Sequence, residues 1–105
     1  MKTLHLPLKK EWYEMIERGE KTEEYREIKE YWWRRFSALD RNSSENEDVE
    51  WNKWECYRFG MVKFSYGYTK RTMTFECKGI TIGQGRPEWG APKEPVFIIK
   101  LGKRV

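Results

Sequence analysis

The residues that could do chemistry are concentrated in one short stretch, residues 19–27, with the sequence GEKTEEYRE. A lysine that is partly desolvated, as Lys21 could be, acquires a lowered pKa and can act as a base or nucleophile. A carboxylate such as Glu24 can activate a water. The planar guanidinium of Arg26 fits a phosphate or a carbonyl group. This pattern predicts a catalytic or ligand-binding site.

The same charges also have a purely structural interpretation. In an extended segment, Thr22, Glu24 and Arg26 would share one face, and Lys21 would lie on the other. Glu24 and Arg26 could then form an ion pair at the rim of the fold, while Lys21 remained solvated. The residue pattern leaves both interpretations open.

Further candidate ligand residues lie in two expected loops. Tyr68, Lys70 and Arg71 combine an aromatic ring with bases at a turn, which suits base stacking with phosphate contact. The alternative is a hairpin end whose tyrosines pack inward. Arg86 and Trp89 could form one wall of a cleft, or the tryptophan could anchor its own loop.

The elements that precede and follow residues 19–27 are predicted from hydrophobic spacing. Residues 3–6 alternate as a short strand that Pro7 would close. Residues 8–18 and 31–39 have apolar side chains at helical spacing, and Gly19 occupies the position of a helix C-cap. The tryptophans of the second helix are expected to pack in the core.

The second half of the chain is predicted to form strands. Residues 56–68 and 72–82 alternate, and each run changes phase once, at Gly60 and at Gly79, which indicates bulges or bends. A loop over 83–95 precedes an apolar strand at 96–101. Bent strands of this kind suit a small barrel. We therefore expect an α+β fold, a small mixed β-barrel with two main helices.

Length and charge add to this expectation. A chain of 105 residues predicts a single domain over 1–105. Residues 40–55 carry two bases and six acids and are expected to form an acidic surface insert. Residues 56–105 carry ten bases and three acids, which suits a nucleic acid or a phosphorylated ligand, the alternative being a solvated basic surface.

The two cysteines, Cys56 and Cys77, form no CxxC motif, so no metal site is expected and no cofactor is implied. They are expected to be free thiols in a reducing compartment, the alternative being one disulfide. No apolar run is long enough to span a membrane, and no signal-peptide core is present. The expected location is cytoplasmic, with no membrane partner.

Residues 19–26, GEKTEEYR, resemble the G-x-K-x-x-E-x-R motif of ASCH domains in the PUA-like superfamily. The expected helices before and after the motif, and the late strand and loop containing residues 79–83 and Trp89-Gly90, fit the resemblance, which covers nearly the whole chain. It implies a β-barrel with a cleft beside the motif and an RNA, nucleoside or nucleotide ligand.

Some small proteins of this family are amidohydrolases that remove the acetyl group from acetylated cytidine, and the resemblance implies this as an alternative function. Their catalytic group is a lysine, a threonine three residues later and a downstream glutamate. Lys21 matches the lysine, whereas Glu24 stands at the threonine position. Glu76 is the nearest candidate for the downstream glutamate.

Overall fold

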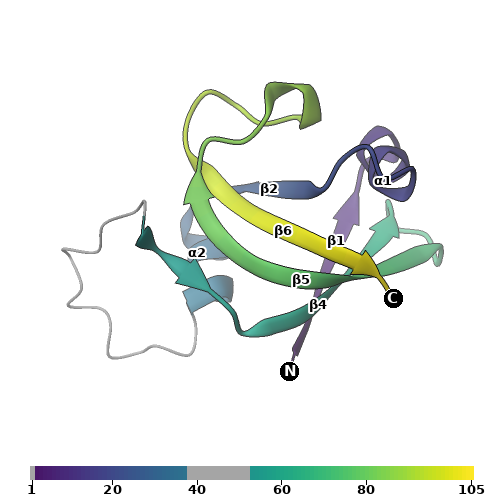
Figure 1. Ribbon diagram of the computed structural model, residues 1–105, viewed down its shortest axis with the longest axis horizontal. Helices are drawn as coiled ribbons and strands as arrows, with labels where there is room; N and C mark the ends of the chain where they lie inside the picture. Colours follow the sequence, from purple (N-terminus) through teal and green to yellow (C-terminus); the bar gives the residue numbers. More distant parts are fainter. Residues whose placement is uncertain (1, 38–52) are drawn as a thin grey trace.

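The computed structural model describes residues 2–37 and 53–105, which form one curled β-sheet with two α-helices beside it (Figure 1). In chain order the elements are β1 (Lys2–Leu8), α1 (Lys10–Glu17), β2 (Glu23–Glu27), α2 (Glu30–Ser37), β3 (Glu55–Cys56), β4 (Phe59–Tyr66), β5 (Thr72–Gly83), a 3₁₀ turn (Pro87–Trp89) and β6 (Val96–Arg104). This combination confirms the α+β prediction.

The strands follow the order β1-β4-β5-β6-β2, and the short β3 pairs with β5. Only the β1–β4 pair is parallel among the described strands, so the sheet is mixed. The sheet curls into a half-barrel (Figure 1), and the prediction of a barrel-like mixed sheet is confirmed at this level. It is not closed by strand pairing, because β1 and β2 remain its two edges.

The core fills the concave side of this sheet. Leu4, Leu6 and Leu8 alternate inward from β1, as the period of a half-buried strand requires. Phe36 of α2 packs edge-on against Phe97 of β6, with ring centroids 4.9 Å apart. Large side chains from both helices and most strands therefore share one cluster.

Pro7 does not end the first strand, contrary to the sequence-based prediction. β1 continues to Leu8, and Pro7 is paired in register with Ser65 of β4. Proline is tolerated here because β1 is an edge strand, so one side of its backbone needs no ladder partner.

The two predicted phase changes are confirmed as irregularities of the sheet. The β1–β4 register shifts where Lys2 pairs with Phe59 and Thr3 with Met61, which leaves Gly60 as the extra residue. The β5–β6 register shifts on both sides of Cys77, before Gly79. β5 is thus one long strand that bends as it crosses the half-barrel (Figure 1).

The predicted role of Gly19 is also confirmed. Its φ of +83° lies in the left-handed region that favours glycine, and its N–H donates to the carbonyl of Ile16 at 3.0 Å. α1 is shorter than expected, and α2 begins one residue earlier than expected, at Glu30. Residues 38–52, which include Leu39 and most of the predicted acidic insert, lie outside the described residues.

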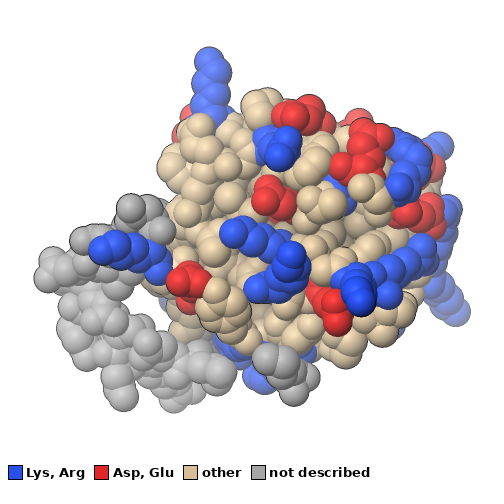
Figure 2. All heavy atoms as spheres, in the orientation of Figure 1, with Lys and Arg blue, Asp and Glu red and all other residues tan. Residues whose placement is uncertain are grey.

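Cys56 and Cys77 are free thiols, as predicted. In the described part of the chain no helix has the length and apolar character needed to cross a membrane. Basic side chains gather over the face formed by β5 and β6, with acidic ones between them (Figure 2). This distribution fits the basic C-terminal half seen in the sequence.

Candidate functional site

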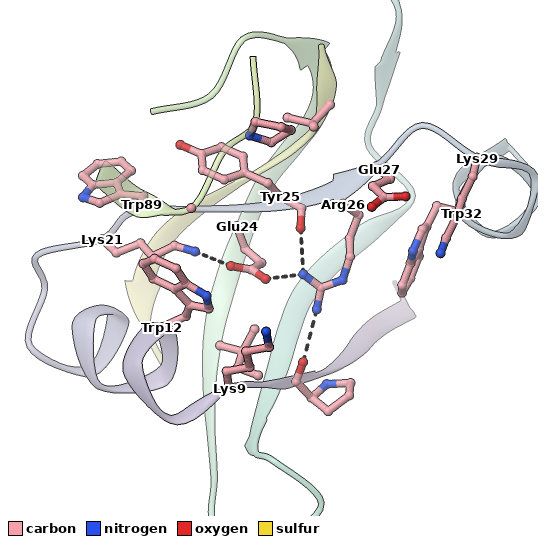
Figure 3. Close-up of a pocket in the computed structure, with 15 residues that line it drawn as sticks. Lys9, Trp12, Lys21, Glu24, Tyr25, Arg26, Glu27, Lys29, Trp32 and Trp89 are labelled. Carbon is pink, nitrogen blue, oxygen red and sulfur yellow. Dashed lines mark hydrogen bonds and ion pairs between the residues drawn. The ribbon is translucent and has the colours of Figure 1, made fainter. Parts of the chain in front are cut away.

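A cavity of about 520 Å³ lies at the seam between the two edge strands of the half-barrel. Its walls come from the end of β1, from β2, from the first turns of both helices and from the loop that contains Trp89 (Figure 3). The volume falls within the range of small-molecule sites. The cavity therefore occupies the place where the sheet fails to close.

Three charged side chains form a continuous chain along the wall of this cavity. Nζ of Lys21 donates to one carboxylate oxygen of Glu24, and the guanidinium of Arg26 donates to the other (Figure 3). Lys21 is 2% exposed and Glu24 is 4% exposed. Glu24 is thus held between two cations on the cavity wall.

The prediction that Lys21 faces away from Glu24 and Arg26 is wrong. Strand β2 begins only at Glu23, so the alternation of side chains does not extend back to Lys21. The chain instead folds back after Gly19, and the N–H of Lys21 donates to the carbonyl of Met15 at 3.1 Å. This turn directs the lysine side chain inward, toward Glu24.

Burial lowers the pKa of Lys21, and the neighbouring carboxylate of Glu24 works in the opposite direction. Nζ also lies 5.2 Å from the ring centroid of Trp12 and 5.3 Å from that of Tyr25. Aromatic faces attract a cation at such distances. An ammonium with three donors and one carboxylate partner keeps N–H groups for a ligand.

Arg26 uses much of its donor capacity within the protein. Besides Glu24, Nη1 donates to the carbonyl of Tyr25 at 2.7 Å, and Nη2 donates to the carbonyl of Pro7 at 3.2 Å. The guanidinium lies 5.4 Å from the ring centroid of Trp32. Arg26 therefore fixes the orientation of Glu24 and Trp32 and connects β2 to β1.

Tyr25 is held by a second network on the other side of β2. Its hydroxyl donates to Glu23 at 2.8 Å and accepts the backbone N–H of Arg86 at 3.0 Å. Burial, chiefly, raises the pKa of Tyr25 to about 12, so the ring stays neutral near neutral pH. The loop with Arg86 and Trp89 is thereby attached to the strand that carries Glu24.

Three tryptophans, Trp12, Trp32 and Trp89, supply aromatic surface to the cavity. The loop approaches Trp12 closely at Gly90, where a Cβ atom would lie 2.8 Å from the indole ring. Gly90 also has a φ of +94°. A glycine is therefore required here both for the backbone conformation and for the closeness of the contact.

Two further lysines, Lys9 and Lys29, line the cavity and are exposed. No carboxylate in the described part of the chain forms an ion pair with either one. The lining carries four bases against two acids. An anionic group near the mouth of the cavity would therefore meet an excess of positive charge.

Four of the nine residues predicted from the sequence line this cavity, namely Lys21, Glu24, Arg26 and Trp89. Arg86 lies beside it, with its guanidinium 4.8 Å from the ring centroid of Trp89. The structure thus brings together the charged motif and the Gly/Pro-rich loop.

The other four predicted residues lie elsewhere. Glu76 is exposed on β5 and accepts the backbone N–H of Lys103 at 3.1 Å. Tyr68 and Lys70 are exposed at the β4–β5 turn, and Arg71 pairs with Glu17 of α1. None of Glu76, Tyr68, Lys70 and Arg71 belongs to the cavity lining, to which β5 and the β4–β5 turn contribute no residue.

Sequence reasoning missed Trp12, Trp32 and Tyr25 as cavity residues. The spacing of the second helix predicts Trp32 in the core, because helical spacing shows only which face of a helix turns inward. Trp12 and Trp32 both lie in the first turn of a helix that directly follows a strand. This position was the signal in the sequence that could have identified them as cavity residues. Those positions place an aromatic ring where the helix meets the sheet.

Within residues 2–37 and 53–105, no three His, Cys, Asp or Glu side chains are grouped as metal ligands. Comparison with models of protein families, with curated proteins and with solved structures gives no match. The cavity combines flat apolar walls with a buried amine, a buried carboxylate and a basic mouth.

Proposed function

We propose that this chain is an ASCH-type domain of PUA-like fold that binds RNA or a nucleotide in the cavity at the seam. The observation that carries the proposal is the set of tryptophan walls around the buried Lys21–Glu24–Arg26 chain. Residues 19–26, which resemble the ASCH motif, supply that chain of charges. A curled mixed sheet flanked by two helices is compatible with the proposed fold.

A nucleobase matches the chemistry of the cavity walls. Its two faces are flat and can stack on Trp12, Trp32 or Trp89, as single-stranded bases stack on aromatic side chains in RNA-binding proteins. Its edge carries donors and acceptors that can pair with the remaining N–H groups of Lys21 and the lone pairs of Glu24. A purely apolar ligand would give the remaining N–H groups of Lys21 no hydrogen-bond partner.

A phosphate attached to that base would lie in a favourable field. Lys9 and Lys29 contribute exposed ammonium groups without carboxylate partners among the described residues. Lysine ammonium groups bind phosphate as point charges. We therefore expect a nucleotide to bind more tightly than the corresponding nucleoside.

Calorimetric titration with cytidine, cytidine monophosphate and a short single-stranded RNA tests the proposal. The Trp89→Ala variant should weaken binding of all three ligands, by about fivefold or more for loss of one stacked base. Tyr68→Ala is the matched control, because Tyr68 is 97% exposed and lies outside the cavity. It should leave the three affinities unchanged.

The proposal is contradicted if none of these ligands binds at millimolar concentration. Equal weakening by Trp89→Ala and Tyr68→Ala would also contradict it, since binding would then not depend on the cavity. Circular dichroism of both variants would show that each keeps the fold.

One observation favours a second candidate function, an amidohydrolase that acts on an N-acylated nucleoside such as acetylated cytidine. Lys21 is buried on the cavity wall, and burial lowers its pKa. An amine with a lowered pKa can take a proton from water as the water adds to the acyl carbon. The amide C–N bond then breaks, acetate leaves, and the proton passes to the departing amine.

Measurement of acetate released from acetylated cytidine tests this candidate. Turnover should disappear in Lys21→Met and in Glu24→Gln, and it should persist in Glu76→Gln, because Glu76 lies outside the cavity. The absence of acetate at high protein concentration would rule out this substrate. If the protein bound cytidine but released no acetate, only the proposed binding function would be supported.

A further inference from the structure

A second hollow, of about 700 Å³, lies on the other side of α2 from the cavity. It is lined by the start of β1, by α2 and by the segment that enters β4. Four of its eight lining residues are basic, namely Lys2, Arg34, Arg35 and Arg58. Its single acidic residue, Glu30, already pairs with Arg34 at 2.6 Å.

Two of these arginines, Arg35 and Arg58, are held by contacts with neutral groups. Nη1 of Arg35 donates to the hydroxyl of Tyr31 at 3.3 Å. Nη1 of Arg58 donates to the carbonyl of Arg35 at 3.0 Å, and its guanidinium lies 5.2 Å from the ring centroid of Phe59. Nε of Arg58 is buried without a hydrogen-bond partner. In the described part of the chain, no carboxylate pairs with Arg35 or Arg58.

Aromatic surface accompanies this charge. Tyr31 is 56% exposed and lines the hollow, and the guanidinium of Arg35 lies 6.0 Å from its ring centroid. An exposed ring beside unpaired guanidinium groups is the combination with which proteins bind single-stranded nucleic acid. An acidic peptide would use the charges but would give the ring no base to stack.

Trp32 connects the second hollow to the first cavity. Arg26 approaches its ring from the cavity side, with a distance of 5.4 Å to the centroid. Arg35 approaches the same ring at 5.8 Å and lines the hollow. One tryptophan ring therefore contacts an arginine from each site, so the cavity and the hollow lie next to each other at Trp32.

We propose that this hollow binds the phosphodiester backbone of an RNA strand whose neighbouring nucleotide occupies the cavity. The inference rests on the proposed function, and it specifies the ligand as a strand instead of a free nucleotide. Lys2, Arg35 and Arg58 contact phosphates, and Tyr31 stacks on a base. The contacts are to backbone and ring faces, so this site contributes affinity without sequence preference.

The test compares an oligocytidylate of about ten nucleotides, a length suited to small single-strand-binding domains, with cytidine monophosphate. The variant is Lys2→Gln combined with Arg35→Gln, which removes two charges from side chains that make no ion pair in the described residues. The control is Arg18→Gln, which removes one positive charge from an exposed side chain at the end of α1 that lines neither site. Figure 1 shows α1 and α2 at opposite ends of β2.

The variant should weaken oligonucleotide binding by about tenfold or more, the change expected when a charge-assisted hydrogen bond disappears. The slope of log affinity against log salt should decrease by about 1 for each phosphate that the variant no longer neutralises. Affinity for cytidine monophosphate should not change. Arg18→Gln should leave both ligands and the salt slope unchanged.

The proposal is overturned if the variant and the Arg18→Gln control bind the oligonucleotide equally well. It is also overturned if an oligoglutamate of equal charge binds as tightly as the oligonucleotide and depends equally on Arg35, because the site would then be an acidic-peptide site. Failure of cytidine monophosphate to bind would contradict the function proposed for the cavity. The comparison of oligonucleotide binding between the variant and the Arg18→Gln control would still test the second site independently.

Discussion

Arg26 of β2 donates a hydrogen bond to the carbonyl of Pro7 in β1, with 3.2 Å between nitrogen and oxygen. These two strands are the edges of the sheet, and no backbone ladder joins them. The same guanidinium holds Glu24 on the cavity wall. One side chain thus links the open seam of the half-barrel and organises the site that lies in it.

Replacement of Arg26 by lysine should therefore lower the free energy of unfolding by about 1.5–3 kcal/mol, the range for hydrogen bonds to charged groups. Lysine keeps the positive charge but cannot reach Glu24, the Tyr25 carbonyl and the Pro7 carbonyl at once. Urea unfolding of the two proteins measures the difference. The Arg104→Lys control changes an exposed guanidinium that makes no side-chain hydrogen bond or ion pair within the described residues, so it should leave the midpoint nearly unchanged. Equal midpoints for all three proteins would contradict a linking role for Arg26.

Removal of the central carboxylate should be more damaging than removal of the lysine beside it. Glu24→Gln leaves Lys21 and Arg26 facing each other in a buried site, which should cost about 3–5 kcal/mol of unfolding free energy. Lys21→Met leaves Glu24 paired with Arg26, so the destabilisation should be clearly smaller. The free energies come from urea unfolding, and the reverse order of the two variants would show that the three charges do not act as described.

The stability of the fold should decrease above pH 10 through Tyr25. Its pKa is raised to about 12 in the folded protein, mainly by burial, whereas an unfolded tyrosine titrates near about 10. The unfolded state therefore loses its proton first, and the stabilisation is complete below pH 10 and lost as the pH rises toward 12. The difference in unfolding free energy between wild type and Tyr25→Phe should fall across this window. A difference that stays constant from pH 9 to about 12 would contradict the burial of the hydroxyl.

Gly90→Ala should disturb the cavity wall more than a comparable change elsewhere. A methyl group at Gly90 would lie 2.8 Å from Trp12, in addition to the left-handed backbone conformation. Gly67 also has a positive φ but has open space around it, so Gly67→Ala should show only the backbone cost of about 1–2 kcal/mol. Thermal unfolding of both variants measures the difference. If Gly67→Ala were the more damaging, the close packing of the loop on Trp12 would be refuted.

Local patterns predicted the parts of this fold that depend on local physics. The helix end at Gly19 and the bends near Gly60 and Gly79 follow from backbone freedom and from changes of alternation. The seam between β1 and β2 could not be predicted from local patterns, because it depends on which strands become the edges of the whole sheet. Pro7 was therefore misread as the end of a strand.

The candidate site was predicted in part for the same reason. Glu24 and Arg26 were placed correctly on one face because both lie within β2. Lys21 was placed on the wrong face, because its position depends on a turn after α1. That turn is fixed by a hydrogen bond from the N–H of Lys21 to the carbonyl of Met15 in α1. Tyr68, Lys70 and Arg71 have chemistry that suits base stacking and phosphate contact, but they lie at the β4–β5 turn, which does not line the cavity.

The most direct test of the central claim, that the cavity holds a nucleobase, follows the indole N–H signals of the tryptophans by NMR during titration with cytidine monophosphate. The signals of Trp12, Trp32 and Trp89 should shift together and saturate, because these rings line the cavity. Those of Trp33 and Trp54 should move little, because neither lines it. Unchanged signals from the three cavity tryptophans at saturating nucleotide would contradict the account.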